Sequence, residues 1–475
     1  MGAIASTIQM GLAYCCCNTT SSLCNTCLGS RSPYSTGRKR SVLLFSFTIL
    51  FSLLFQYTLA PAILHQNTWW DMYKSLPGMG KRLFNCWTSG CAQYNEEDTQ
   101  DLYVQCVGNA AVYRPTFVST VFFAICAGVT KMNPSMNREV WPAKIGIYLI
   151  GLAISMFLPN VLFTGFYLLF MRVCAMVFIV IQQIILIDMA YNWNESWVEK
   201  SNRCESLEWG SGKKWLKAIV ATSILMYLGC AVGIYFLYKY FMGCGGNTAV
   251  LTLTWIGILA ITVVQLTCEE GSLLTTSVIS AYMTYLAYST VSKNPNAVCN
   301  PTLGSDDMWG IAVGLFFTMI SLAWTGWSWT ATNRLSEEGL EVTRSLTPTD
   351  SSRPDASNLN LDVPFIDPAD RPTTGVVMQP NATTFAQDEA FNSGAGASIW
   401  KLNVVLVLIS CWVAASLTGW GAISGGIGEE GEHTAANPLV GKFNMAMIAV
   451  SQNVALLMYL WTLLAPRLFP DREFA

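Results

Sequence analysis

One long apolar stretch carries four polar side chains able to bind charged or hydrogen-bonding ligands. Between residues 161 and 190 these are Arg172, Gln182, Gln183 and Asp188. Charges inside a membrane are costly and often functional. Arg172 and Asp188 lie about 24 Å apart along a helix, so they cannot pair directly. Two interpretations stay open. Arg172 and the glutamines line a polar groove that meets lipid phosphate, or Asp188 lies at the interface while Arg172 reaches the surface or another helix.

A later apolar stretch, residues 272–291, is rich in hydroxyl groups. Ser272, Thr276, Ser280 and Thr284 recur every four residues, so they share one face of a helix. Small hydroxyl residues allow helices to pack closely and to hydrogen-bond to one another. The alternative is a hydroxyl-lined furrow that guides lipid headgroups or a small polar solute.

Residues for catalysis or metal binding are scarce. His65 and His433 are the two histidines, and they are far apart in sequence. A histidine-based zinc site or a Ser-His-Asp triad therefore has little to draw on. The sequence also lacks a phosphate loop, HExxH and GxSxG. We predict a protein that is not an enzyme, binds no metal or cofactor and is not driven by ATP.

The composition places these residues in a membrane. Of 475 residues, 52% are hydrophobic and 12% are charged, against about 25% charged residues in soluble domains. The net charge of −3 argues against a nucleic-acid partner, which favours basic proteins. The sequence predicts an all-α polytopic membrane protein.

We predict ten spans, because a bilayer core of about 30 Å needs about 20 apolar residues as helix. Residues 161–190 contain no proline, and helical character could continue through Trp193 and Trp197. A helix of about 45 Å or more must tilt, protrude or both. The ten spans are 42–60, 113–130, 142–158, 161–190, 216–238, 249–267, 272–291, 308–329, 402–420 and 443–465.

The Lys/Arg distribution orients this chain with both termini in the cytosol. Residues 331–400 are rich in Pro, Ser, Thr and Asp, a composition typical of flexible segments. The predicted organisation is a Cys-rich cytosolic N-terminus at 1–41, eight helices over 42–330 with an outer loop at 61–112, a flexible cytosolic loop at 331–400, two helices over 401–466 and a cytosolic tail at 467–475.

The predictions for the cysteines and the glycosylation sequons depend on this orientation. The outer set can form disulfides, and because its number is odd at least one thiol stays free. This set is Cys86, Cys91, Cys106, Cys244 and Cys299. The cytosolic set suggests palmitoylation better than zinc, with reduced thiols as the alternative. It is Cys15, Cys16, Cys17, Cys24 and Cys27.

Two further modifications are predicted from short motifs. Gly2 fits the myristoylation pattern, with a plain interfacial N-terminus as the alternative. The sequons at Asn18, Asn194 and Asn381 all fall in the cytosol in this orientation, so we expect none to be glycosylated.

Short motifs in order along the chain resemble the serine incorporator (SERINC, also TMS) family. They include Val112-Tyr113-Arg114, the run from Asp188 to Trp197, Gly271-Ser-Leu-Leu, Cys299-Asn-Pro301, Leu417-Thr-Gly-Trp420 and Tyr459 to Pro466. The entry to the ninth span, Ser398–Asn403, departs from the family pattern. The chain is therefore similar to a distant member.

The resemblance implies two helical bundles separated by a long tilted fourth helix. It also implies lipid handling in an endomembrane or plasma membrane. Implied partners are membrane phospholipids, phosphatidylserine and sphingolipids among them, together with lipid-synthesis enzymes and a second copy of the chain.

Three functions follow as hypotheses. The first is an ATP-independent phospholipid scramblase, which the polar seventh span and Arg172 favour. The second is a non-catalytic facilitator of serine incorporation into phosphatidylserine and sphingolipids, as a scaffold or a serine carrier. A carrier usually needs a midplane site at broken helices, and no convincing pair of broken spans is present. The third is a structural or regulatory protein that organises lipids.

Overall fold

Ten helical segments of the computed structural model coincide with the ten predicted spans. The structure describes residues 33–64, 79–91, 100–133, 141–207, 212–267, 272–303, 308–327, 399–427, 433–435 and 438–468. The predicted myristoylation site, the N-terminal cysteines, the sequons at Asn18 and Asn381 and almost all of loop 331–400 lie outside these residues.

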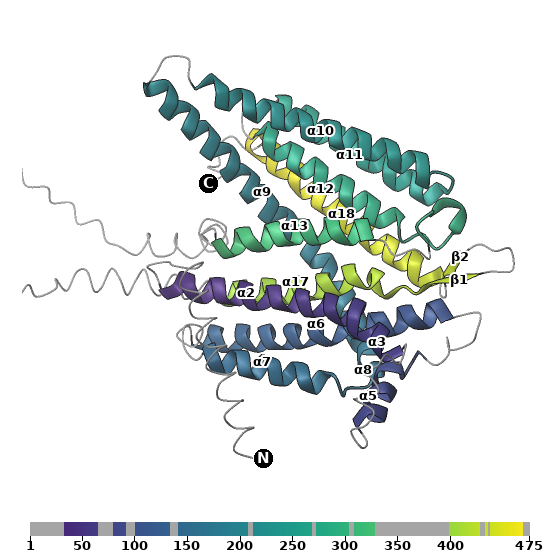
Figure 1. The fold of residues 1–475 in the computed structure, drawn as a ribbon. Helices are drawn as coiled ribbons and strands as arrows, with labels where there is room; N and C mark the ends of the chain where they lie inside the picture. The colour runs from purple at the N-terminus through teal and green to yellow at the C-terminus, as the bar shows by residue number, and fades with distance from the viewer. Residues whose placement is uncertain are drawn as a thin grey trace, which may run out of the picture.

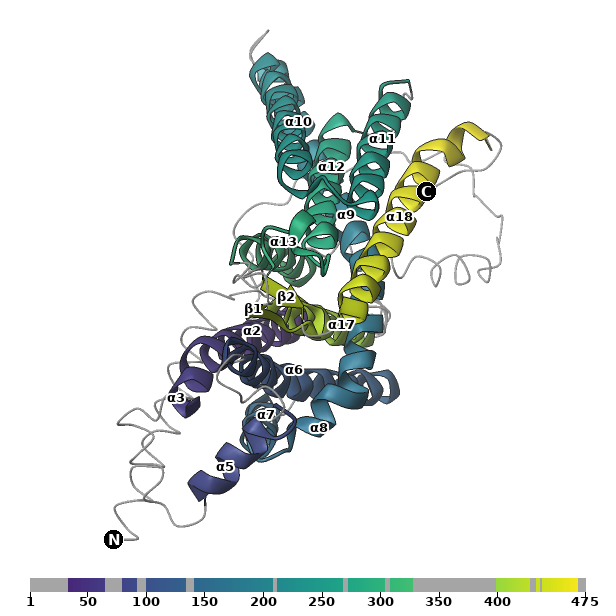
Figure 2. The same ribbon diagram turned by 90° about the vertical axis from the view of Figure 1, so that its right-hand side faces the viewer.

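The helices form two bundles, which Figure 1 and Figure 2 show from perpendicular sides. The first contains α2 (Pro33–Leu54), α6 (Gln100–Met132), α7 (Trp141–Ser155) and α17 (Ile399–Leu417). The second contains α10 (Lys213–Phe241), α11 (Gly245–Thr267), α12 (Leu273–Val291) and α18 (Pro438–Leu468). Helix α13 (Met308–Trp327) lies between them and contacts both.

A long diagonal helix joins the bundles. It begins with α8 (Asn160–Leu162) and a π-helical segment, η5 (Phe163–Tyr167), and continues as α9 (Leu168–Leu207). The candidate span extends from Asn160 to Ser206, 47 residues, or about 70 Å of helix. Because the hydrocarbon core is about 30 Å thick, this helix must tilt and also protrude. The prediction of an overlong, tilted fourth helix between two bundles is confirmed.

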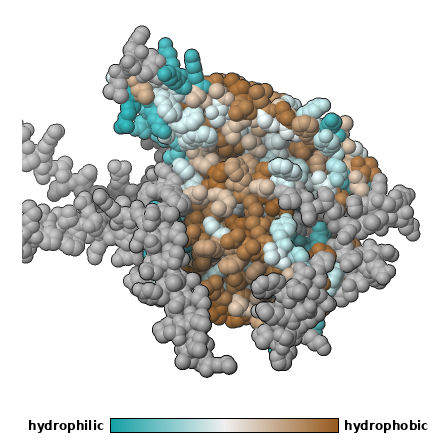
Figure 3. Space-filling model, viewed as in Figure 1, coloured by the Kyte–Doolittle hydropathy of each residue, from teal (hydrophilic) through white to brown (hydrophobic). Residues whose placement is uncertain are grey.

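The described helices suit a membrane. Seven are long and apolar enough to cross one, and α7 and α13 contain shorter apolar helices. Helix α12 is rich in Ser, Thr and Tyr and is almost wholly enclosed by its neighbours. A hydrophobic belt crosses the visible face of the molecule, perpendicular to the helices of the first bundle (Figure 3). The all-α polytopic fold is therefore confirmed.

Some helices extend beyond the predicted spans, and others end before them. The second span was expected to begin at residue 113, but α6 begins at Gln100. Its first turns carry polar residues and Cys106, which hydropathy assigned to a loop. Within the same predicted loop 61–112, α3 (Ala60–Leu64) continues the first span through the π-helical segment η1 (Phe55–Leu59), and α5 (Met79–Thr88) forms a short helix.

The third and ninth spans also end differently from the prediction. Helix α7 stops at Ser155 rather than residue 158, because Pro159 follows in an extended conformation. After α17, a 3-10 turn, η8 (Gly419–Gly421), leads into an antiparallel hairpin of β1 (Ser424–Ile427) and β2 (His433–Ala435). The pairs Ser424–Ala435 and Ile427–His433 set its register.

Two disulfides lie at the ends of helices. Cys91 bonds to Cys106, and Cys244 bonds to Cys299. Cys86 has a free thiol. The first bond ties the end of α5 to α6, and the second joins the α10–α11 turn to the segment after α12. The α5–α6 connection and the α10–α11 turn lie at the same end of the molecule in Figure 1. Disulfides require an oxidising compartment, so the predicted outer position of these cysteines would place both on one side of the membrane.

Arg114 fastens the corner near the first disulfide. It is fully buried, and its guanidinium donates to the carbonyl oxygens of Ala110, Cys86 and Leu158 at 2.6, 3.2 and 3.2 Å. It also donates to Asn160 Oδ1 at 2.9 Å and lies 4.3 Å from the centre of a Trp87 ring. One side chain therefore joins α5, α6 and the start of the diagonal helix.

We expect Arg114→Ala to lower the free energy of unfolding by about 3 kcal/mol or more, because several buried acceptors lose their donor. Thermal unfolding of the purified protein in detergent measures this. Arg82→Ala is the matched control, since Arg82 is exposed on α5. Equal melting temperatures for both variants would contradict the role of Arg114.

Candidate functional site

The four polar residues predicted on the fourth span face four different neighbours. All lie on α9, over about 24 Å of its length. Arg172 contacts η8, Gln182 contacts α12, Gln183 contacts α18 and Asp188 contacts α13. We call these four residues the α9 polar row. It follows the boundary between the two bundles.

Arg172 binds the end of α17. Its Nε and Nη2 donate to the carbonyl oxygen of Trp420 at 3.1 and 2.9 Å, and the side chain is 9% exposed. Asn444 of α18 donates to the same oxygen at 3.2 Å. The C-terminal end of a helix carries partial negative charge, so a cation is favourable there. This contact belongs to the interpretation in which Arg172 reaches another helix.

The turn that presents this carbonyl has an unusual backbone. Gly419, Trp420 and Gly421 have φ angles of +56°, +63° and +69°. A bulky residue rarely adopts this conformation. Trp420 is nevertheless buried and packs edge-on against Trp412, with ring centroids 6.1 Å apart. Packing and the donors on its carbonyl hold the turn.

Helix α13 is tied to the same junction. Trp412 Nε1 donates to Thr318 Oγ1 at 2.9 Å. Farther along the row, Trp324 Nε1 donates to Asp188 Oδ2 at 2.7 Å. Asp188 Oδ1 also accepts from Asn192 at 3.3 Å. Asp188 is half-buried, so α13 covers the end of the row where α9 leaves the bundles.

The two glutamines are buried and only partly bonded. Gln182 Oε1 accepts from the Tyr282 hydroxyl at 3.2 Å, and Gln183 Nε2 donates to the Ala455 carbonyl at 2.7 Å. Gln182 Nε2 and Gln183 Oε1 have no hydrogen-bond partner among the described residues. A buried polar atom left unpaired costs about 1–3 kcal/mol. These two atoms therefore keep unused hydrogen-bonding capacity inside the protein.

The hydroxyl row of α12 lies inside the second bundle. Ser272, Thr276 and Ser280 are buried, and Thr284 is half-buried. Ser280 and Thr284 donate to the carbonyl oxygens four residues earlier, at 2.8 and 2.9 Å. Thr276 bonds to the Tyr459 hydroxyl at 2.9 Å. These contacts favour helix packing over an open furrow. The α12 row does not contact the α9 polar row directly; Tyr282 of α12 does.

Several residues of the junction were missed from sequence. Trp420 was noted only as part of a family motif, and Asn444 and Trp324 were not singled out. Gly419 and Gly421, one on each side of Trp420, could have indicated a turn at the end of the ninth span. Among the residues that the structure describes, no cluster of three or more His, Cys, Asp or Glu side chains could hold a metal ion.

Comparison with known proteins gives consistent matches. The sequence model of the family described as Serine incorporator (Serinc) matches residues 13–472, a range that contains every described helix. "Probable serine incorporator" of Nematostella vectensis is 26% identical over 97% of this chain and 94% of its own length. Serine incorporator 2 of Homo sapiens is 24% identical over 78% and 80%, and serine incorporator 3 of Mus musculus is 28% identical over 64% and 64%.

A methyl group added at Gly421 tests whether the left-handed turn is as tightly packed as the structure shows. A Cβ on Gly421 would lie 2.5 Å from Leu168 Cδ1 and 2.9 Å from the Tyr113 hydroxyl, at a positive φ. We expect Gly421→Ala to lower the free energy of unfolding by about 1–3 kcal/mol. Thermal unfolding measures the loss. Gly128→Ala is the control, because a Cβ there meets nothing within 4 Å. A Gly421→Ala protein as stable as this control would rule out the strained turn.

Proposed function

Because the chain belongs to the serine incorporator family, we propose that it is an integral membrane protein that exchanges phospholipids between leaflets without ATP. In this proposal headgroups move along the α9 polar row while acyl chains stay in the surrounding lipid. Exchange down a gradient needs no energy-coupling site, and the sequence offers no phosphate loop.

This proposal rests on polar atoms without hydrogen-bond partners at the boundary between the two bundles. We call this boundary, along which the α9 polar row lies, the seam. Arg172 has no carboxylate partner among the described residues, and Gln182 keeps two unbonded N–H groups. Burying polar groups within a membrane costs free energy, and the polar groups that are found there often have a function. Phosphate oxygens accept hydrogen bonds from guanidinium and amide donors. A passing headgroup would accept hydrogen bonds from the Gln182 amide, whose donors are otherwise unpaired, and would meet the positive charge of Arg172.

Headgroups can reach the row only when the seam opens, since Gln182 is fully buried. Helix α13 is the element whose movement would uncover it, because α13 contacts α9, α12 and the first bundle. It packs against α9 and α12 at identifiable points. A Cβ on Gly314 would lie against the Tyr285 hydroxyl, and the Asp188–Trp324 hydrogen bond closes the far end. Thermal opening of α13 would then set the rate of exchange.

The test is dithionite quenching of fluorescent phosphatidylserine and phosphatidylcholine in proteoliposomes without ATP. We expect quenching well beyond the outer-leaflet half. Gln182→Leu should slow it about tenfold or more, as the loss of one hydrogen bond to a charged group implies. Tyr282 keeps a second acceptor, the Ile179 carbonyl at 3.2 Å, so this variant should fold.

Val177→Ala is the matched control on the same helix, since Val177 is 46% exposed and lies away from the row. It should scramble like the wild type. Quenching that stops at one half with folded wild-type protein would remove the proposal. Equal rates for Gln182→Leu and Val177→Ala would move the path away from α9.

The relatives are named serine incorporators, and this name favours a second candidate, facilitation of serine incorporation. We propose phosphatidylserine and sphingolipids as the lipids that would receive the serine. In this role the chain would assist a lipid-synthesis enzyme without catalysing the reaction. Labelled serine fed to cells with and without the protein would test it. Higher labelling of phosphatidylserine with unchanged leaflet exchange in liposomes would favour this candidate. Unchanged labelling would exclude it.

A further inference from the structure

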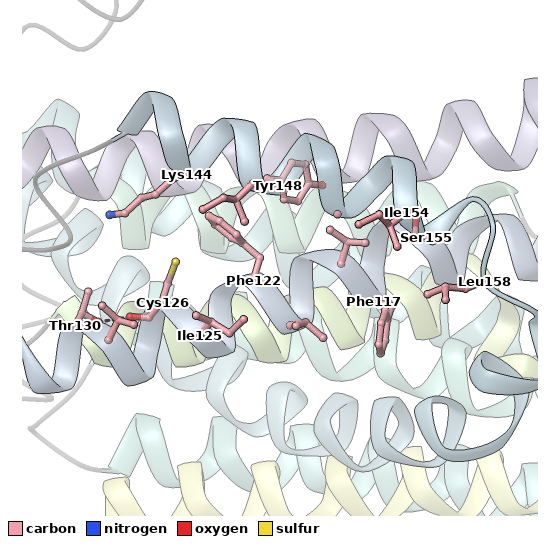
Figure 4. A pocket seen from close by; sticks show the side chains of 15 residues that line it. Phe117, Phe122, Ile125, Cys126, Thr130, Lys144, Tyr148, Ile154, Ser155 and Leu158 are labelled. Atoms are coloured by element: carbon pink, nitrogen blue, oxygen red, sulfur yellow. Dashed lines mark hydrogen bonds between the residues drawn. The ribbon is translucent and has the colours of Figure 1, made fainter.

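Two surface features lie away from the α9 polar row. The first is a groove of about 390 Å³ between α6 and α7, which Figure 4 shows from close by. Its walls are apolar, with Phe117, Phe122 and Ile125 among them, so the hydrocarbon of a membrane can fill it without a specific ligand. The second is the corner where α9 ends and α10 begins, at which hydrophilic residues gather (Figure 3). This corner carries both aromatic and charged groups, and these point to a ligand.

Three tryptophans pack together at the α9–α10 corner. The ring centroids of Trp193 and Trp197, both on α9, are 5.3 Å apart. Those of Trp197 and Trp215 are 5.9 Å apart and join α9 to α10. All three side chains are half-buried. Tryptophan is enriched where a membrane meets water, with its ring at the level of the lipid headgroups, so this cluster places the corner at the surface of one leaflet.

The start of α10 carries three exposed lysines, Lys213, Lys214 and Lys217. Helix α10 has no acidic residue, and the three lysines make no ion pair among the residues that the structure describes. The N-terminal end of a helix carries partial positive charge, so cations there are unfavourable unless an anion lies beside them. The apolar part of α10 begins directly afterwards, at Ala218, so the ammonium groups stand at the membrane surface.

The end of α9 adds two cations to the corner. Lys200 is exposed and holds its Nζ 5.2 Å from the centre of the Trp215 ring, and Arg203 is exposed one turn later. The two helices are fixed relative to each other, because Ser201 Oγ donates to the Gly212 carbonyl oxygen at 2.9 Å. The cations of α9 and α10 therefore belong to one surface.

Four acidic residues are near these cations in sequence. Glu205 accepts a hydrogen bond from the Gly212 backbone N–H at 3.0 Å, so it is engaged within the corner. Glu195 and Glu199 are exposed on α9, and Glu208 lies outside the described residues. Because none of the four is on α10, the positive charge is concentrated on the first turns of that helix.

We propose that the α9–α10 corner binds the headgroups of anionic phospholipids, with the phosphates against Lys213, Lys214 and Lys217 and the tryptophans beside them at the interface. The predicted orientation places this corner in the cytosol, and the cytoplasmic leaflet is the one that carries anionic lipid. The contact holds the end of the diagonal helix at that leaflet. It does not require leaflet exchange, so it is present whether or not the protein scrambles lipid.

The test is native mass spectrometry of the purified full chain with phosphatidylglycerol and phosphatidylcholine of identical acyl chains. The wild type should retain phosphatidylglycerol preferentially. Lys213→Gln combined with Lys217→Gln should lower this preference about tenfold or more, since each basic residue near an anionic surface favours the lipid about fivefold. The matched control is Lys239→Gln combined with Lys442→Gln, which removes two exposed lysines at the opposite end of the second bundle. The control should keep most of the preference.

A phosphatidylglycerol with a photoactivatable headgroup, added to the unmodified chain, should label peptides from the end of α9 and the start of α10. Glycerophosphoglycerol, the same headgroup without acyl chains, should not displace the lipid at equal concentration. Displacement would show a site for a soluble anion and overturn the membrane surface. An equal loss of preference in the two double variants, or labelling confined to other helices, would overturn the assignment to this corner.

Discussion

The contact of Arg172 with the Trp420 carbonyl ties the diagonal helix α9 to the turn that leads out of the first bundle. The guanidinium donates two hydrogen bonds to this carbonyl, which lies in the turn after α17. Asn444 brings α18 to the same oxygen. Three helices from different parts of the chain thus converge on one acceptor. Trp420 adopts a strained left-handed conformation, which places its carbonyl oxygen where both donors reach it.

The diagonal helix α9 connects this junction to the rest of the boundary between the bundles. Since α9 contacts α17 near one end and α13 near the other, any shift between the bundles must break or tilt contacts along it. Nearer its middle, Gln182 and Gln183 each leave one buried polar atom without a hydrogen-bond partner among the described residues. A seam that is hydrogen-bonded at one end and has unpaired polar atoms near its middle can open there while the bundles stay joined. At one end of the first bundle, the hydrogen bonds of Arg114 and the first disulfide tie α5, α6 and the start of the diagonal helix together.

Hydropathy predicted the ten spans and the overlong helix, because burial in lipid acts on each segment separately. It failed where tertiary contacts decide. The first turns of α6 became helix because a disulfide and α5 pack against them, which no local pattern records. The α12 hydroxyls illustrate a second limit. A Ser or Thr every fourth residue predicts one face, but the same pattern serves a packed helix, where each hydroxyl bonds its own backbone, or an open furrow. Arg172 was found from its charge, whereas its acceptor lies 248 positions away.

The most direct test of the seam is a cross-link between α9 and α13. Asp188→Cys and Trp324→Cys would be joined by a short bis-maleimide, which dithionite does not cleave, in an otherwise cysteine-depleted background that keeps the four disulfide-bonded residues. The account predicts that proteoliposomes with the cross-link quench only the outer leaflet, whereas the same double variant capped with a monofunctional maleimide quenches both leaflets. Exchange at an unchanged rate with the cross-link intact would contradict it.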